Sequence, residues 1–202
     1  MSALGIRSKP GISIRIEPPI MNIIRQLAIT SRVAIGITLL AAIPTFAEGV
    51  YQEPAEFVAE VFDDAVPNPQ LLWITGTMRD EVQQILGRDM LPLRIRYWHQ
   101  DTRTAWVLDE IGKDRPITTG VVINAGVIET IQVLVFRESR GWEVRYPFFT
   151  GQFIGARIDS RMRLDRSIDG ISGATLSVNA LKRQARLALL LTQYTNNAAN
   201  ER

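Results

Sequence analysis

The sequence of 202 residues contains no cysteine and a single histidine, His99. Without cysteine the chain cannot form disulfides, thiolate zinc sites, iron–sulfur clusters or the C-x-x-C-H attachment of c-type haem. With one histidine, bis-histidine haem and multi-histidine metal centres are also excluded. If the protein is a redox protein, its cofactor must therefore be organic. His99 ends a strand-like run, and we interpret it as a surface or strand-end residue, with a catalytic role as the alternative.

A strong excess of either charge is absent as well. The 23 lysine and arginine residues nearly balance 21 aspartate and glutamate residues, for a formal net charge of +2. This charge is too small to indicate nucleic-acid binding, so no nucleic-acid partner is expected. With 46% hydrophobic and 22% charged residues, the composition is that of a globular protein. The length suits one domain with a terminal appendage.

The N-terminal region has the pattern of an export signal. Residues 33–43 form an uncharged apolar run, preceded by Arg25 and Arg32 and followed by the small residues Thr45 and Ala47. A positive flank, an apolar centre and small residues predict a signal peptide cleaved after Ala47. The alternatives are a retained membrane anchor, although spanning requires about 20 apolar residues, and a buried helix. We therefore expect a periplasmic or otherwise extracytoplasmic protein.

Four segments of the chain follow from this reading. Residues 1–20 contain three prolines and no periodic pattern, whereas Met21 begins a typical positively charged n-region. We hypothesise that translation starts at Met21, with 1–20 an extension outside the real protein. Residues 21–47 are then the signal peptide or anchor. Residues 48–112 form the N-terminal part of the mature domain, and residues 113–202 form its core with a C-terminal helix.

Hydrophobic periodicity predicts an α+β fold. A helical pattern covers residues 54–62, and a second helix is predicted from an N-cap at Thr77 to about Leu86, ended by Gly87. A long amphipathic helix is predicted over residues 177–194. Alternating or β-branched runs predict strands at 93–97, 104–108, 117–123, 127–136 and 143–146. A hairpin is expected through Asn124-Ala125-Gly126. Together these elements predict an antiparallel sheet with helices packed on one face.

The most informative motif is Asp169-Gly170-Ile171-Ser172-Gly173-Ala174-Thr175. It resembles the site at which a flavin transferase attaches FMN to a threonine hydroxyl through a phosphoester bond. Such sites occur in the FMN-binding domains of Rnf-type and sodium-pumping NADH:quinone oxidoreductase complexes. The resemblance implies that Thr175 carries covalent FMN. The alternative is that the heptapeptide is an ordinary turn leading into a helix cap.

The residue types of this motif suit the attachment. Gly173 and Ala174 are small, so they leave the Thr175 hydroxyl reachable, and glycine allows a sharp turn before the helix. A phosphate on Thr175 would lie at a helix N-terminus, where free N–H groups and the dipole stabilise negative charge. Asp169 is an unfavourable neighbour for a phosphate. We interpret Asp169 as a residue read by the modifying enzyme or as a turn former.

The resemblance extends over about residues 115–190. The paired strands there resemble those of FMN-binding domains, and Glu138-Ser139-Arg140-Gly141 corresponds to the family's E-T-x-G loop near the flavin. Ser139 replaces the usual threonine, and Arg140 occupies a position often held by proline. The resemblance implies a set of cofactor-binding residues: Glu138, Ser139, Gly141, Asp169, Ser172, Gly173, Ala174 and Thr175.

Two further groups near the motif have open interpretations. Trp142 or Phe149 could stack on a flavin ring, but aromatic residues at such positions are more often core. The arginines at 157, 161, 163 and 166 alternate with acids and are interpreted as a solvated face, with phosphate neutralisation as the alternative.

The expected function follows from the resemblance and the N-terminus together. It is an exported flavoprotein that transfers electrons between a membrane-bound redox protein and a second redox partner, after maturation by a flavin transferase. The alternatives are a flavin-dependent reductase of a small acceptor and a non-redox docking subunit. No catalytic residue and no metal ligand is predicted, since His99 is isolated and no paired carboxylates stand out.

Overall fold

The computed structural model describes residues 49–200, with side chains placed to residue 197. The predicted extension 1–20 and the signal peptide or anchor 21–47 lie outside the described residues. Within residues 49–200, no helix is both long enough and apolar enough to cross a membrane.

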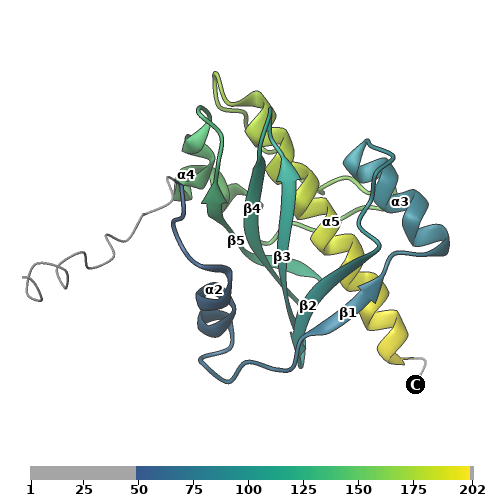
Figure 1. Ribbon diagram of the computed structural model, residues 1–202. Coiled ribbons are helices and arrows are strands. Elements are labelled where there is room, and N and C mark those ends of the chain that lie inside the picture. Colours follow the sequence, from purple (N-terminus) through teal and green to yellow (C-terminus); the bar gives the residue numbers. More distant parts are fainter. Residues whose placement is uncertain (1–48, 201–202) are drawn as a thin grey trace, which may run out of the picture. The chain divides into compact units, whose positions relative to one another are not determined.

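Five strands form one open sheet in chain order, and every neighbouring pair is antiparallel (Figure 1). The strands are β1 (Gln70–Trp73), β2 (Arg94–Gln100), β3 (Arg103–Ile111), β4 (Pro116–Asn124) and β5 (Val127–Phe136). Each predicted strand from 93 to 136 is present, with β3 longer than expected. The β4–β5 hairpin turns at Ala125 and Gly126, whose φ angles are 48° and 78°. Two positive φ values match the tight hairpin turn predicted from the sequence.

Helices cover both faces of this sheet. α5 (Thr175–Asn200) runs diagonally across one face, and α3 (Gly76–Leu86) packs beside it (Figure 1). α2 (Pro54–Val61) packs on the other face. The α+β class and the antiparallel sheet with packed helices are confirmed. The placement on one face holds for α3 and α5, but α2 corrects it.

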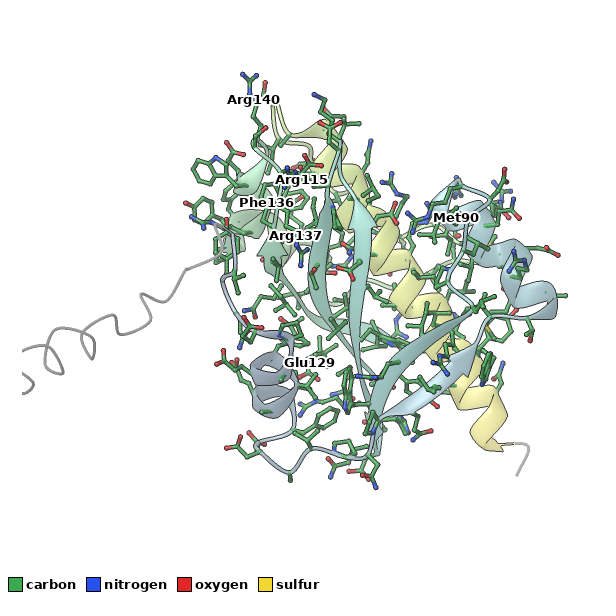
Figure 2. All side chains as sticks on the ribbon, in the orientation of Figure 1. Met90, Arg115, Glu129, Phe136, Arg137 and Arg140 are labelled. Atoms are coloured by element: carbon green, nitrogen blue, oxygen red, sulfur yellow. The ribbon has the colours of Figure 1, made fainter. Side chains whose placement is uncertain are left out.

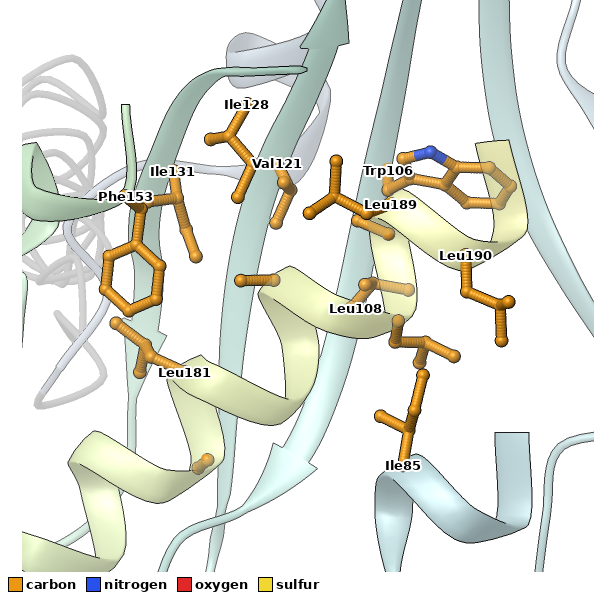
Figure 3. Packing of buried hydrophobic residues seen from close by; sticks show 14 of the residues in the cluster. Ile85, Trp106, Leu108, Val121, Ile128, Ile131, Phe153, Leu181, Leu189 and Leu190 are labelled. Atoms are coloured by element: carbon orange, nitrogen blue, oxygen red, sulfur yellow. The ribbon is translucent and has the colours of Figure 1, made fainter. Parts of the chain in front are cut away.

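The alternation of β3 explains why both faces need a cover. Trp106 and Leu108 belong to the large core under α5, whereas Ala105 belongs to the small core under α2. Since successive side chains of a strand point to opposite faces, a strand that is apolar at consecutive positions is buried on both sides. Figure 3 shows Leu189 and Leu190 of α5 beside Trp106.

Polar side chains on α5 fix its position on the sheet. The Trp106 indole N–H donates to the Thr192 hydroxyl over 2.8 Å. The Gln184 side-chain amide, fully buried, donates to the carbonyl oxygens of Leu108 and Ile117, both at 2.9 Å. Buried polar groups are costly unless they are paired, so these bonds disfavour any other register of α5.

An ion-pair cluster adds a second constraint on α5. Glu110 is 3% exposed and pairs with Arg183 of α5 at 2.8 Å and with Arg88 at 3.0 Å. Removing one partner of a buried pair leaves an uncompensated charge, so this cluster favours one arrangement of helix and sheet.

Three local predictions are wrong. Residues 143–146 are predicted as a strand, but Trp142–Arg145 is the 3₁₀ helix η1, between the left-handed turn at Gly141 and Pro147. Pro147 is the first residue of the following helix α4 (Pro147–Thr150), a position that proline favours. The N-cap of α3 is Thr75 and not Thr77. The last helix begins at Thr175 and not at 177.

A substitution at Gly120 of β4 tests the packing of α2 against the sheet. A Cβ at this position would lie 2.4 Å from ring atoms of Phe57, which is buried. We expect Gly120→Ala to lower the free energy of unfolding by about 1–3 kcal/mol, because the core cannot accommodate the extra methyl group. Urea unfolding followed by circular dichroism measures this. Gly151→Ala is the control, since nothing lies within 4 Å of its Cβ position, and an equal loss there would contradict the packing argument.

Candidate functional site

Thr175 is the first residue of α5, and its side chain is exposed. The chain turns at Ser172 and Gly173, where Gly173 has φ +81°, and the Ala174 N–H donates to the Ile171 carbonyl over 3.0 Å. Ala174 is buried at 2% exposure. The turn therefore fixes Ala174 in the core and leaves the next residue, Thr175, facing solvent.

Two side chains hold the segment that enters this turn. The ammonium group of Lys182 in α5 donates to the Ile168 carbonyl over 2.7 Å, and the Gln152 amide oxygen accepts from the Asp169 N–H over 2.7 Å. Ile168 itself is buried. The Asp169 side chain is exposed. This geometry agrees with Asp169 as a turn former or as a residue read by another protein.

Glu138 connects the second predicted segment to the β3–β4 turn. Its Oε1 accepts the backbone N–H groups of Lys113, Asp114 and Arg115 over 2.6, 2.7 and 2.9 Å. Burial raises the pKa of the Glu138 carboxyl, but the three N–H groups outweigh burial and hold this pKa below its ordinary value. The structure thus gives Glu138 a positioning role. Its direct contact with a cofactor stays a prediction.

Gly141 brings this segment against the start of α5. Its φ is +82°, and a Cβ there would lie 2.5 Å from the Ser177 hydroxyl oxygen and 3.4 Å from the Ala174 Cβ. Only glycine allows both the left-handed backbone and this close approach. The predicted loop and the predicted attachment turn, far apart in sequence, are therefore in direct contact.

A pocket of about 610 Å³ opens between these two segments. Its volume lies within the range of about 300–1,000 Å³ that is usual for small-molecule sites. Five predicted site residues line it: Glu138, Ser139, Gly173, Ala174 and Thr175. Gly141, Asp169 and Ser172 are outside this lining. The lining also includes Lys113, Arg140, Leu176 and Ser177, which were not predicted as site residues.

Lys113 is the pocket residue that sequence reasoning could least have found. It lies in the β3–β4 turn, 62 positions before Thr175 (175 − 113). The antiparallel pairing of β3 with β4 and the hydrogen bonds to Glu138 bring the turn to this end of the sheet. Figure 2 shows Arg115 and Arg140 at the end of the molecule where α5 begins.

The pocket is suited to an anion. The first N–H groups of an α-helix have no partner within the helix, and the helix dipole adds positive potential at this end. Lys113 and Arg140 contribute two cationic side chains to the lining. The first turn of α5 contains no acidic residue. A phosphate on Thr175 would therefore find donors and compensating charge, so the residues present fit the phosphoester of an FMN.

The structure distinguishes the three other candidate residues from the sequence, two aromatic residues and the histidine, by their burial and contacts. Phe149 is fully buried and packs edge-on against Phe153, with ring centroids 5.5 Å apart, so it is core. Trp142 is 41% exposed. His99 lies in β2 and contacts the Thr104 hydroxyl through Nδ1 at 3.0 Å, as a strand residue.

The arginines at 157–166 do not line this pocket. Arg163 pairs with Asp159, and Arg166 pairs with Asp165, each at 3.3 Å. Arg166 also donates to the carbonyl oxygens of Ile154 and Gly155. These contacts agree with the interpretation of a solvated, self-paired loop.

Comparison with known protein families assigns a class to the region that contains the site. Residues 112–190 match the family of the FMN-binding domain. This part of the chain is therefore an FMN-binding domain, and it indicates a flavin-bearing redox protein. The match includes every residue that lines the pocket and leaves out α2, α3 and β1–β3. A search of curated proteins found no match to the chain.

Two glycines allow the contact between loop and helix to be tested. Gly141→Ala introduces both backbone strain and the clash with Ser177, whereas Gly173→Ala, with φ +81° and nothing within 4 Å, introduces strain alone. We expect Gly173→Ala to cost about 1–2 kcal/mol of unfolding free energy and Gly141→Ala to cost more. Urea unfolding of both variants measures the difference. Equal losses would show that the close approach to α5 contributes nothing.

Glu138 predicts a pH dependence of stability. A carboxyl whose pKa is lowered on folding stabilises the protein above its unfolded pKa, and this contribution is lost as the pH falls through the folded pKa. In Glu138→Gln, the free energy of unfolding should be lower near neutral pH and should fall less steeply in acid. Urea unfolding between about pH 7 and about pH 3 measures both curves. Parallel stability curves for the wild type and Glu138→Gln would contradict the conclusion that an ionised Glu138 holds the β3–β4 turn.

Proposed function

We propose that Thr175 carries FMN through a phosphoester bond and that the protein is an exported electron carrier. Electrons would pass between a membrane-associated donor and a second redox protein. The observation that carries this proposal is the exposed Thr175 hydroxyl at the N-terminus of α5, on the wall of a cationic pocket. The match to the FMN-binding domain over residues 112–190 supports the identity of the cofactor.

The residues of the pocket divide the work of holding this group. Thr175 supplies the covalent link, and Lys113 and Arg140 offset the charge of the phosphate together with the free N–H groups of the first helical turn. The space beside the proposed attachment point is open, because nothing lies within 4 Å of the Cβ position of Gly173. When bound, the flavin ring supplies one- and two-electron chemistry.

Covalent attachment suits a protein that acts outside the cytoplasm. Occupancy of a non-covalent site falls as free ligand becomes scarce, whereas an ester bond makes occupancy independent of concentration. A flavin transferase must reach the hydroxyl from solvent, and the exposure of Ser172, Gly173 and Thr175 permits this. The export pattern at residues 21–47 supports the same compartment.

The pocket favours a carrier over a reductase of small molecules. Its titratable lining consists of Lys113, Glu138 and Arg140. The Glu138 carboxylate is held by three backbone N–H groups with a lowered pKa, so it is a poor proton donor near neutral pH. Arg140 does not release its proton, and Lys113 is paired with Asp114 at 3.5 Å, so this lining favours electron transfer over proton delivery to a reduced substrate.

Substitution of the hydroxyl tests the attachment. The chain is produced together with a flavin transferase, FMN precursor and Mg²⁺, and a denaturing gel is viewed under ultraviolet light. Fluorescence should be present in the wild type and in Ser172→Ala, and absent in Thr175→Val, which keeps the shape of the side chain. Intact mass should show one FMN added only where the gel is fluorescent. An unmodified wild-type protein beside an active transferase would refute the proposal.

A further inference from the structure

Four exposed aromatic residues lie together beside the point where the described chain begins, three of them around one arginine and the fourth, Phe148, next to Tyr146. Tyr51, Trp142, Tyr146 and Phe148 are 41%, 41%, 38% and 63% exposed. The guanidinium carbon of Arg145 lies 4.3 Å from the ring centroid of Tyr51, 5.3 Å from that of Trp142 and 4.9 Å from that of Tyr146. We call these five residues the aromatic patch.

The patch is held firmly and is separate from the core. Its segment η1–α4 is fixed by Val144 and Phe149, both fully buried. Phe148 lies next to Phe149 and points outward instead. Large aromatic side chains that remain in water while their neighbours fill the core mark an interaction surface, since nothing in the fold of residues 49–200 requires their exposure.

Basic residues outnumber acidic ones around the patch when the adjoining Thr175 pocket is included, because that pocket adds Lys113 and Arg140. Tyr51 and Trp142 line a second pocket of about 700 Å³ together with Arg115 and Arg137. Its acidic residues are Asp114 and Glu138, and the Glu138 carboxylate is already engaged by three N–H groups. Glu143 in η1 is the other acidic residue of this segment. Exposed rings within an arginine-rich rim fit an anionic surface that also accepts apolar groups.

The sequence before Gly49 contains an apolar segment that is joined to the described domain by a short stretch of chain. Five residues separate Ile43, the end of the apolar run 33–43, from Gly49, which also lines the second pocket. Six extended residue steps span at most about 20 Å. Where the run is retained as a membrane anchor, it keeps Gly49, two residues before Tyr51 of the patch, within about 20 Å of the membrane.

From these observations we propose that the aromatic patch rests on the headgroup region of an anionic phospholipid membrane. Tryptophan and tyrosine prefer the membrane interface, where an apolar ring and a polar tip are both satisfied. Arg145 and the neighbouring arginines meet the anionic headgroups. This contact does not depend on flavin.

The contact has a consequence that rests on the proposed function. The two pockets share Glu138 and Ser139, so a membrane seated against the patch lies beside the rim of the Thr175 pocket. The domain would then present its attachment site to a donor embedded in the same membrane.

Tryptophan quenching by brominated lipid tests the contact. The four tryptophans are Trp73, Trp98, Trp106 and Trp142, and residues 1–48 contain none, so quenching reports the domain and not the apolar run. The full chain, produced without a flavin transferase, is reconstituted in vesicles of phosphatidylcholine and phosphatidylglycerol brominated near the headgroup. Quenching should be present in the wild type and lost in Trp142→Phe. Trp73→Phe is the matched control, because Trp73 is also exposed, at 56%, but lies on β1, outside the patch. The Trp73→Phe variant should still be quenched, through Trp142.

Charge reversal tests the electrostatic part. Arg145→Glu should lower the ratio of docked to undocked domain, read from the quenching amplitude, by at least about fivefold. Vesicles of phosphatidylcholine alone should have a similar effect on the wild type. Met90→Asp is the control: Met90 is 87% exposed and lies on the far side of the molecule from Arg140 (Figure 2), so quenching should not change.

Absence of quenching in the wild type, or quenching that survives in Trp142→Phe, would overturn the proposal. Crosslinking from Trp142 to a membrane protein without lipid quenching would assign the patch to a protein partner and would also overturn it. Unchanged circular dichroism and urea midpoints for each variant exclude misfolding as the cause. Because the protein is flavin-free, the result is independent of whether Thr175 is modified.

Discussion

The packing of α5 across the sheet is the constraint on which the site depends. The helix begins at Thr175, so its register on β3 and β4 decides where the threonine hydroxyl lies. Leucine and alanine side chains supply the apolar contact, but apolar packing alone tolerates sliding. The hydrogen bonds of Gln184 and Thr192 to the sheet, and the pairing of Arg183 with Glu110, are satisfied in one arrangement. These polar interactions give α5 one defined position on the sheet, which apolar packing alone would not specify.

Around the start of this helix, small residues and backbone groups do most of the structural work. Glu138 acts at a distance from any ligand by holding three N–H groups of the β3–β4 turn. Gly141 then lets the same loop lie against Ala174 and Ser177. Hydrogen bonds of Glu138 and the close approach of Gly141 to α5 thus hold the segments that line the Thr175 pocket. Its basic residues are Lys113, which pairs with Asp114 at 3.5 Å, and Arg140.

The end of the molecule that contains the Thr175 pocket differs from the opposite side in which residues it exposes. The end that contains the Thr175 pocket has a cationic lining and, beside it, the aromatic patch around Arg145. On the far side, Met90 is exposed near α3 (Figure 2), and Leu93 and Trp73 are exposed as single residues where β2 begins and β1 ends. Isolated exposed apolar residues are normal on a protein surface, whereas a cluster of rings requires an explanation. The Thr175 pocket and the pocket beside the patch share Glu138 and Ser139, so the proposed attachment site lies next to the proposed contact surface.

Local pattern in the sequence was enough for several features. The alternating and β-branched runs of strands β2–β5, the hairpin at Ala125 and Gly126, and the glycine stop of α3 follow from nearest-neighbour conformational preferences. The D-x-x-S-G-A-T motif before an amphipathic helix pointed to the Thr175 site, because the requirements for a reachable hydroxyl beside a helix N-terminus are local as well.

The predicted strand at 143–146 failed for the opposite reason. Its alternation is real, but the left-handed turn at Gly141 and Pro147 on the other side confine the segment to a 3₁₀ turn. The second face of the sheet was missed because a strand buried on both sides loses its simple alternation. Sequence by itself determined which residues could carry the chemistry. Only the tertiary structure brought Lys113 into the Thr175 pocket and set Gly141 against Ala174 and Ser177, since cross-strand register and the position of α5 are set by non-local packing that short windows of sequence do not contain.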